Sequence, residues 1–73
     1  MDLDRSVAVW PQVCDELRRR IDAGTYPAGE RFPAVNVLAA ELDVAPSTVQ
    51  KAVAALRKEG RLRTQLGQGS FVV

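Results

Sequence analysis

Apolar residues recur every three or four positions in three segments of this 73-residue chain, the spacing typical of helices with one buried face. The first segment runs from Trp10 to a stop at Gly24, the second spans residues 35–42, and the third spans residues 46–59. The apolar positions are, in order, Trp10, Val13, Cys14, Leu17 and Ile21; Val35, Leu38, Ala39 and Leu42; and Val49, Ala52, Val53 and Leu56. The pattern therefore predicts three helices.

After Gly60 the period changes from helical spacing to alternation, which is typical of strands. Leu62 stands between two arginines, and Phe71 follows Ser70. Between these runs, residues 66–69 read Leu-Gly-Gln-Gly, and glycines of this kind can adopt positive φ and let the backbone approach a partner closely. The end of the chain is thus predicted to be a β-hairpin with its tip at residues 66–69.

The segment between the first two helices has the chemistry of a turn and a short extended piece. Residues 26–29 suit a type I turn with Pro27 in its second position and Gly29 in its fourth. Residues 30–32 can extend until Pro33 stops further ladder pairing. Ala34 offers no capping side chain to the second helix, a weakness of about 1 kcal/mol.

The second and third helices are separated by only three or four residues, which makes a helix-turn-helix. The full order of helix, short strand, helix, helix, strand, turn and strand is that of a winged helix-turn-helix. The predicted fold is mainly α with a small wing sheet of two or three strands. It occupies residues 10–73, after a loose N-terminal arm of residues 1–9.

The outer face of the third helix carries short hydrogen-bonding side chains and a cation at its start: Ser47, Thr48, Gln50 and Lys51. Hydroxyl, amide and ammonium groups match base edges and phosphates, so this face is predicted to enter a nucleic-acid groove. Thr48 has an alternative role as a helix cap.

Charge divides unevenly along the chain. Residues 1–43 hold five arginines and eight carboxylates, a formal charge of −3, whereas residues 44–73 hold five cations and only Glu59, a charge of +4. A basic half favours a polyanionic partner. Residues 18–20 are three arginines on the first helix, which we interpret as a solvated basic face, with phosphate contact as the alternative.

Composition excludes several other classes of site. The chain has one cysteine and no histidine, which excludes a disulfide framework, a zinc site and histidine-based catalysis, so no enzyme activity and no cofactor are expected. Cys14 is predicted to be a small buried hydrophobe. Neither a signal-peptide pattern nor a transmembrane run is present, and a cytoplasmic, nucleoid-associated protein is expected.

Spaced motifs from Trp10 to Val73 resemble the DNA-binding domain of the GntR family of bacterial transcription regulators. They are Ile21-x-x-Gly24, Pro27-x-Gly29-x-x-Phe32-Pro33, Leu38-Ala-x-Glu-Leu-x-Val44, Thr48-Val-x-x-Ala52, Leu56-x-x-Glu-Gly60 and Gly67-x-Gly69-x-Phe71-Val72. The start of the third helix is similar to the YtrA-like branch. The resemblance implies major-groove contacts by Ser47, Thr48 and Gln50, a DNA contact by Asn36, and minor-groove contacts by Gly67 and Gln68.

Three departures from the family pattern remove charge. Ala45-Pro46 replaces a frequent Ser-Arg pair, Asn36 replaces an arginine, and Gln68 replaces a frequent basic residue. Asn and Gln prefer adenine, whereas Arg binds guanine. We expect weaker intrinsic binding and a shifted sequence preference.

The sequence thus predicts a regulator that binds double-stranded DNA sequence-specifically, and a repressor that acts by occlusion. Lys51 would read or anchor in the groove, and Lys58, Arg63 and Thr64 would bind phosphates. The alternatives are a protein-interaction module and a non-specific DNA-binding accessory protein. Palindromic sites would require a homodimer, held by the arm, Trp10 or DNA itself. The chain stops at Val73, so we expect no effector domain and no small-molecule effector site.

Overall fold

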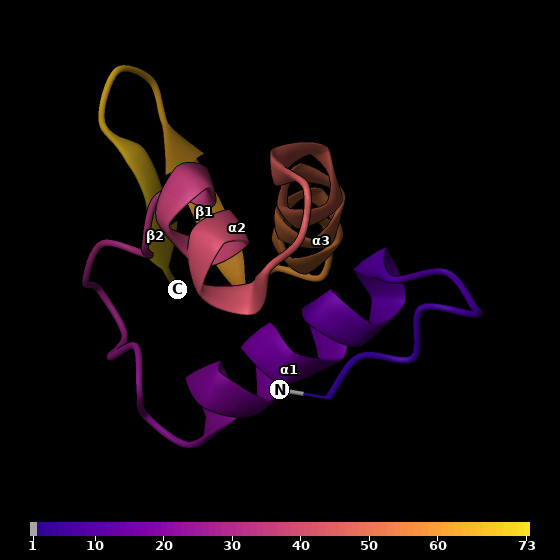
Figure 1. Ribbon diagram of the computed structural model, residues 1–73. Helices are drawn as coiled ribbons and strands as arrows, with labels where there is room; N and C mark the ends of the chain where they lie inside the picture. The colour runs from indigo at the N-terminus through magenta and orange to yellow at the C-terminus, as the bar shows by residue number, and fades with distance from the viewer. Residues whose placement is uncertain (1) are drawn as a thin grey trace.

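A computed structural model describes residues 2–73, which fold into three helices and one β-hairpin (Figure 1). The elements are α1 (Trp10–Asp22), α2 (Val35–Leu42), α3 (Pro46–Lys58), β1 (Leu62–Gln65) and β2 (Gly69–Val72). In Figure 1, α1 runs below α2 and α3, while the hairpin stands to one side and its tip extends beyond the helices. The predicted winged helix-turn-helix is confirmed. None of the helices in this described part is long and apolar enough to cross a membrane.

The core lies where α1 and α2 pack against α3, with β1 closing one side. Its five largest fully buried side chains are Val13, Leu17, Leu38, Val49 and Leu56. They occupy the periodic apolar positions of the sequence, since residues three and four apart share one helix face. Trp10 departs from this pattern, because it lies in the first turn of α1 and keeps 37% of its surface exposed.

The corner between α2 and α3 is set by backbone conformation. Ala34 is extended and, as predicted, supplies no side-chain cap to α2. Asp43 ends α2 in the left-handed region with φ 55°, and the Val44 N–H donates to the Ala39 carbonyl at 3.0 Å. Ala45 is again extended, and Pro46 starts α3, where its missing N–H costs no helix hydrogen bond. These few residues turn the chain sharply enough to bring α3 across α2.

The turn before α2 begins one residue later than predicted. The Glu30 N–H donates to the Pro27 carbonyl at 3.1 Å, so the turn spans residues 27–30 and the prediction for residues 26–29 is wrong. Gly29 takes the third position with φ 83°. A type II turn demands positive φ at that position, and glycine alone adopts it without steric cost.

The extended piece at residues 30–32 pairs with β2 on the edge opposite β1. It forms a single bridge between Arg31 and Phe71 instead of a full strand. The Phe32 N–H donates to the Ser70 carbonyl at 2.8 Å, and the Val72 N–H donates to the Glu30 carbonyl at 3.0 Å. This edge piece fixes the wing to the body of the domain.

The N-terminal arm is held in place, so the prediction of a loose segment is wrong for its described residues; Met1 lies outside them. The Gln12 side chain accepts from the Asp4 N–H and donates to the Asp4 carbonyl, both at 2.8 Å. Arg5 donates to the Asp43 carbonyl at 2.8 Å, and Leu3 packs against the core. The arm therefore connects α1 to the corner between α2 and α3.

Candidate nucleic-acid interface

The ten cations of the chain fall into two groups. Five pair with carboxylates within 4 Å: Arg5, Arg18, Arg19, Arg20 and Arg61. The other five form no ion pair with any residue from 2 to 73: Arg31, Lys51, Arg57, Lys58 and Arg63. The second group lies on α3, the wing or the edge piece beside the wing. Its positive charge is available to an external anion.

The arginines of α1 are committed to internal contacts. Arg20 donates to Glu16, to Glu41 of α2 and to the Tyr26 hydroxyl, at 2.7 to 2.9 Å. Hydrogen bonds from Arg19 and then Arg20 lower the pKa of Glu16 to about 2. Only Arg19 fits the predicted solvated face, with 66% of its side chain exposed. The alternative of phosphate contact loses support, because these charges are already neutralised.

Arg18 joins α1 to the end of α3. Its guanidinium donates to Asp15 at 2.6 Å and to both carboxylate oxygens of Glu59, at 3.0 and 2.6 Å. The pKa of Glu59 is lowered mainly by these hydrogen bonds. Glu59 is the only acidic side chain in residues 44–73. Because it pairs with Arg18, it does not neutralise the cations of that segment that form no ion pair. Nearby, burial raises the pKa of the Cys14 thiol, which fits the predicted buried hydrophobe.

The predicted reading residues of α3 differ in exposure. Ser47, Gln50 and Lys51 are exposed, whereas Thr48 is half-buried. Thr48 lies eleven residues before Glu59, and at 3.6 residues per turn both fall on the flank that faces α1. The Thr48 N–H donates to the Ala45 carbonyl at 3.0 Å, and the alternative role of the Thr48 hydroxyl as a helix cap stays a prediction.

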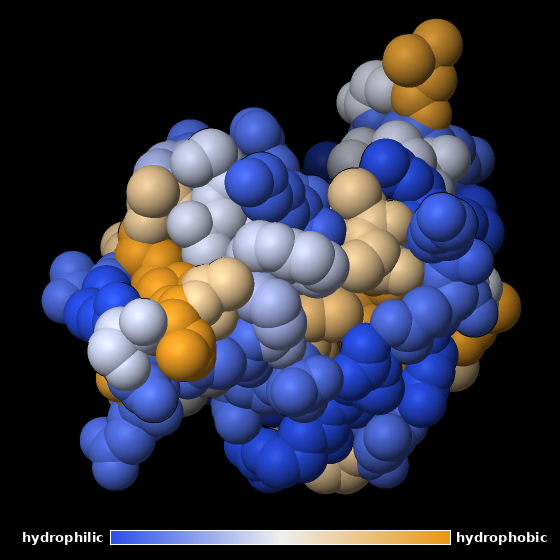
Figure 2. Space-filling model, turned by 90° about the vertical axis from the view of Figure 1, so that its right-hand side faces the viewer, coloured by the Kyte–Doolittle hydropathy of each residue, from blue (hydrophilic) through white to orange (hydrophobic). Residues whose placement is uncertain are grey.

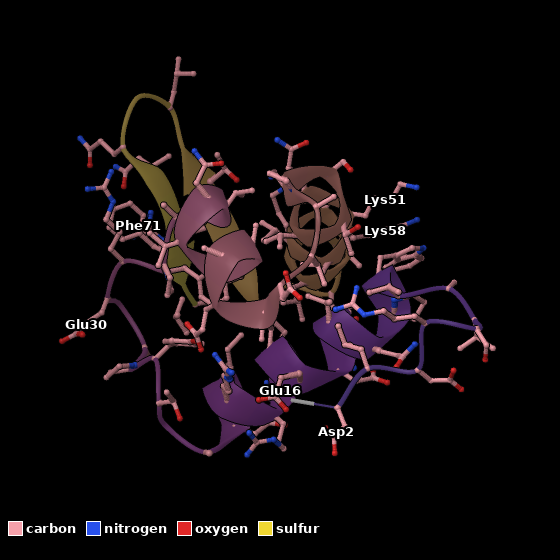
Figure 3. All side chains as sticks on the ribbon, in the orientation of Figure 1. Asp2, Glu16, Glu30, Lys51, Lys58 and Phe71 are labelled. Atoms are coloured by element: carbon pink, nitrogen blue, oxygen red, sulfur yellow. The ribbon has the colours of Figure 1, made fainter. Side chains whose placement is uncertain are left out.

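Lys51 and Lys58 share the outward stripe of α3. They are seven residues apart, about two helical turns, and both are exposed. Figure 3 shows both lysines extending from α3 on the side away from the wing. Asp2 and Glu16 lie near α1, at the opposite end of the molecule from the wing tip (Figure 3). The two lysines can therefore meet an anionic surface without interference from those carboxylates.

Arg57 connects α3 to the wing and was missed by the sequence analysis. It follows Gln50 by seven residues, so both lie on the same flank of α3. Its guanidinium donates to the Thr64 hydroxyl of β1 at 2.8 Å. The sequence could have indicated this position, because Arg57 lies seven residues after Gln50 and therefore on the same side of the helix. The contact positions Thr64, a predicted phosphate ligand, beside the polar flank of α3.

The two strands of the wing pair antiparallel, from Leu62 opposite Val72 to Gln65 opposite Gly69. The Arg63 guanidinium lies 5.0 Å from the centre of the Phe71 ring and donates to the Gln65 side chain at 3.2 Å. Arg31 reaches from the edge piece to Gly69 of β2. If Gly69 carried a Cβ atom, that atom would lie 3.4 Å from the Arg31 guanidinium. Arg31 was also missed, since sequence spacing gives no sign that it reaches the wing.

The wing tip closes with a hydrogen bond from the Gln68 N–H to the Gln65 carbonyl at 2.9 Å. Gly67 has φ 77°, and a Cβ added there would meet no atom of residues 2–73 within 4 Å. Gly67 and Gln68 are both exposed, as expected of groove-contacting residues. Leu66 beside them is 98% exposed and was not among the predicted site residues. Asn36, also exposed, lies separately in the first turn of α2.

Comparison with known proteins places these features in context. Residues 11–72 match the family model described as bacterial regulatory proteins, gntR family. An uncharacterised HTH-type transcriptional regulator of Rhizobium meliloti is 41% identical over 66 residues, covering 90% of this chain and 27% of the relative. The HTH-type transcriptional repressor YtrA of Bacillus subtilis is 28% identical over 72 residues, covering 99% of this chain and 55% of YtrA.

Two solved structures share the fold closely. A GntR family transcriptional regulator from Listeria monocytogenes superposes with a TM-score of 0.91 at 32% identity, covering 97% of this chain and 62% of that one. The DNA-binding domain of AraR, in complex with operator ORR3, superposes with a TM-score of 0.82 at 27% identity, covering 100% of this chain and 90% of that one. The chain thus spans 27% of the Rhizobium regulator, 55% of YtrA and 62% of the Listeria regulator.

Proposed function

We infer that this chain, which belongs to the gntR family of bacterial regulatory proteins, binds double-stranded DNA and serves transcription regulation. One observation carries the inference: the five cations without ion pairs in residues 2–73 all lie on α3, the wing or its edge piece. Phosphates supply most of the affinity in protein–DNA complexes, and they need unopposed cations. AraR supports the inference, because its DNA-binding domain shares this fold and its structure contains an operator.

In this proposal α3 enters the major groove, which is wide enough to admit a helix. Ser47 and Gln50 face the bases and Lys51 reads or anchors beside them in the groove, because these three are the exposed polar residues at the start of α3. Thr48 contributes less, since it is half-buried towards α1. Asn36 meets the DNA from the start of α2.

The remaining residues position the domain on the backbone and at the minor groove. Lys58, Arg63 and Thr64 bind phosphates, and we add Arg57 and Arg31 to this group because both lie beside the wing without a carboxylate partner among residues 2–73. Gly67 and Gln68 bring the wing tip to the minor groove. Phosphate contacts of this kind fix register, while the side chains on α3 provide sequence preference.

We further propose that the bound domain represses by occlusion, because a protein seated on an operator excludes others from the same DNA. A pair of half-sites one helical turn apart would engage two copies of the chain. The role assigned to residues 2–73 is binding, without catalysis and without a small-molecule effector site. A DNA partner would place the protein in the bacterial cytoplasm.

Selection of duplexes from a random library tests sequence-specific binding. The proposal predicts enrichment of one motif, with any half-site spacing visible in it. Gln50→Ala should then broaden the preference at the positions read by α3, while leaving affinity for unrelated duplexes unchanged, because no charge is lost. Gln68→Ala is the matched control, since it removes the same amide from the wing and should leave the α3 positions unaltered.

Absence of any enriched motif would overturn sequence-specific binding. An unchanged preference in Gln50→Ala would overturn the reading role of Gln50 alone. Failure to bind any duplex would favour a protein-interaction module.

A further inference from the structure

Leu66 is an apolar side chain that the fold itself does not use. It is 98% exposed at the tip of the wing, where the surrounding residues 63–70 are otherwise polar or glycine. The apolar residues of the hairpin that support the domain, Leu62 and Val72, are buried at its base. Figure 2 shows a hydrophobic projection that stands clear of the body of the molecule. An exposed leucine at this extremity contributes nothing to the core.

The tip around Leu66 is narrow and has a defined shape. The pairing of Gln65 with Gly69 and the hydrogen bond from the Gln68 N–H to the Gln65 carbonyl close the loop over residues 66–68. Gly67 adds no side chain, and the space beside its Cα is open. Leu66 therefore projects from a closed loop with no side chain at the next position, and a single leucine side chain is small enough to enter the minor groove of B-DNA, which is about 6 Å wide.

Polar and charged groups around this loop suit the same partner. Arg31 and Arg63 lie lower on the wing, and neither pairs with a carboxylate among the described residues. The Gln68 amide beside the tip can donate to the acceptors that adenine and thymine present in the minor groove. The wing thus has cations for the phosphates at its base and an apolar group at its far end.

We propose that Leu66 enters the minor groove as an apolar wedge and disfavours G·C pairs at the step it covers; this rests on the DNA-binding function proposed above. A G·C pair presents the guanine N2 amino group in the minor groove, whereas an A·T pair presents only acceptors. Leucine satisfies neither donors nor acceptors, and the loss of water from the acceptors is common to both pairs, so the additional unsatisfied amino group makes contact with G·C the less favourable. Apolar wedges of this type part base steps in other minor-groove complexes.

Duplexes that differ only beneath the wing test the proposal. The selected site is prepared with A·T, G·C or inosine·C at the wing positions; inosine lacks the N2 amino group. The full 73-residue chain should bind the A·T and inosine·C duplexes about five- to tenfold more tightly than the G·C duplex, as one unfavourable base pair does in other complexes. Leu66→Ala should reduce this ratio to near one while keeping the preference set by α3.

Val7→Ala is the matched control, because Val7 is 57% exposed in the N-terminal arm, distant from the wing in sequence and fold. It should leave the ratio unchanged. Both substitutions remove exposed surface, so thermal unfolding should match that of the parent chain. Unequal binding that persists in Leu66→Ala, or equal binding by the parent chain, would overturn the wedge while leaving the DNA-binding function intact.

A change of oligomeric state in Leu66→Ala, measured by sedimentation without DNA, would also overturn the wedge and assign Leu66 to contact between copies. Failure of the parent chain to bind any of the three duplexes would overturn the proposed function itself.

Discussion

The Arg57 guanidinium donates a 2.8 Å hydrogen bond to the Thr64 hydroxyl, which joins the last turn of α3 to the first strand of the wing. Neither residue is part of the core, and Arg57 has no carboxylate partner within residues 2–73. The contact therefore holds the wing against the end of α3, while the charge of Arg57 stays available to an external anion.

Substitutions of Arg57 and Thr64 should distinguish the effect of the Arg57 charge on DNA binding from the effect of the hydrogen bond that holds the wing. Arg57→Ala removes a cation and the hydrogen bond, so the slope of log affinity against log salt should become shallower by about one unit. Thr64→Val removes this hydrogen bond and the proposed neutral contact with phosphate but no charge, so it should lower affinity while leaving the slope unchanged. Fluorescence anisotropy across a salt series measures both. Equal slopes in the two variants would contradict a phosphate role for Arg57.

Stability should depend on Arg20 far more than on Arg19. Arg20 is 17% exposed and bonds to Glu16, Glu41 and Tyr26, so Arg20→Ala breaks the hydrogen bonds that join α1 to Glu41 of α2 and to Tyr26. We expect a loss of about 1 to 2 kcal/mol in the free energy of unfolding, measured by urea denaturation. Arg19→Ala, the comparison, breaks only the pair with Glu16, in which Arg19 is 66% exposed and screened by solvent, so it should lower the urea midpoint less than Arg20→Ala does.

Acid should weaken the fold through Glu16. Its pKa in the folded protein is about 2, below the ordinary value of 4.5, so the folded state binds its proton less readily than the unfolded state. The resulting stability is fully present above about pH 5 and is lost as the pH falls towards 2. Urea denaturation at pH 7 and pH 3 should show this loss, and Glu16→Gln should make it smaller. An identical pH dependence in Glu16→Gln would contradict the assignment.

The helices were predictable because burial alone determines their pattern. Leu38 and Leu56 recur with their neighbours at helical spacing, and α3 begins at Pro46 as local chemistry requires. The wing followed in the same way from Leu62 and its alternating neighbours. The side-chain contacts between elements could not be predicted from the sequence, because they depend on how far long side chains reach once the helices have packed.

Arg18, Arg31 and Arg57 illustrate that limit. The sequence shows only that all three side chains are positively charged. The packed structure shows that Arg18 pairs with Glu59, whereas Arg31 and Arg57 have no carboxylate partner in the described chain. The arm was misjudged for a related reason: Arg5 reaches a carbonyl thirty-eight residues away. Leu66 was placed in the hairpin tip, but the sequence pattern does not show that the fold leaves 98% of its surface exposed.

The central claim is that the cations without ion pairs form the DNA-binding surface, and the salt dependence of binding tests it most directly. The parent chain should give a slope of log affinity against log salt of about −4, the value for four or five phosphate contacts. Lys51→Gln and Arg63→Gln should each make the slope shallower by about one unit, while Arg19→Gln, which removes a cation already paired with Glu16, should not. A slope near zero for the parent chain, or an equal effect of Arg19→Gln, would contradict the account.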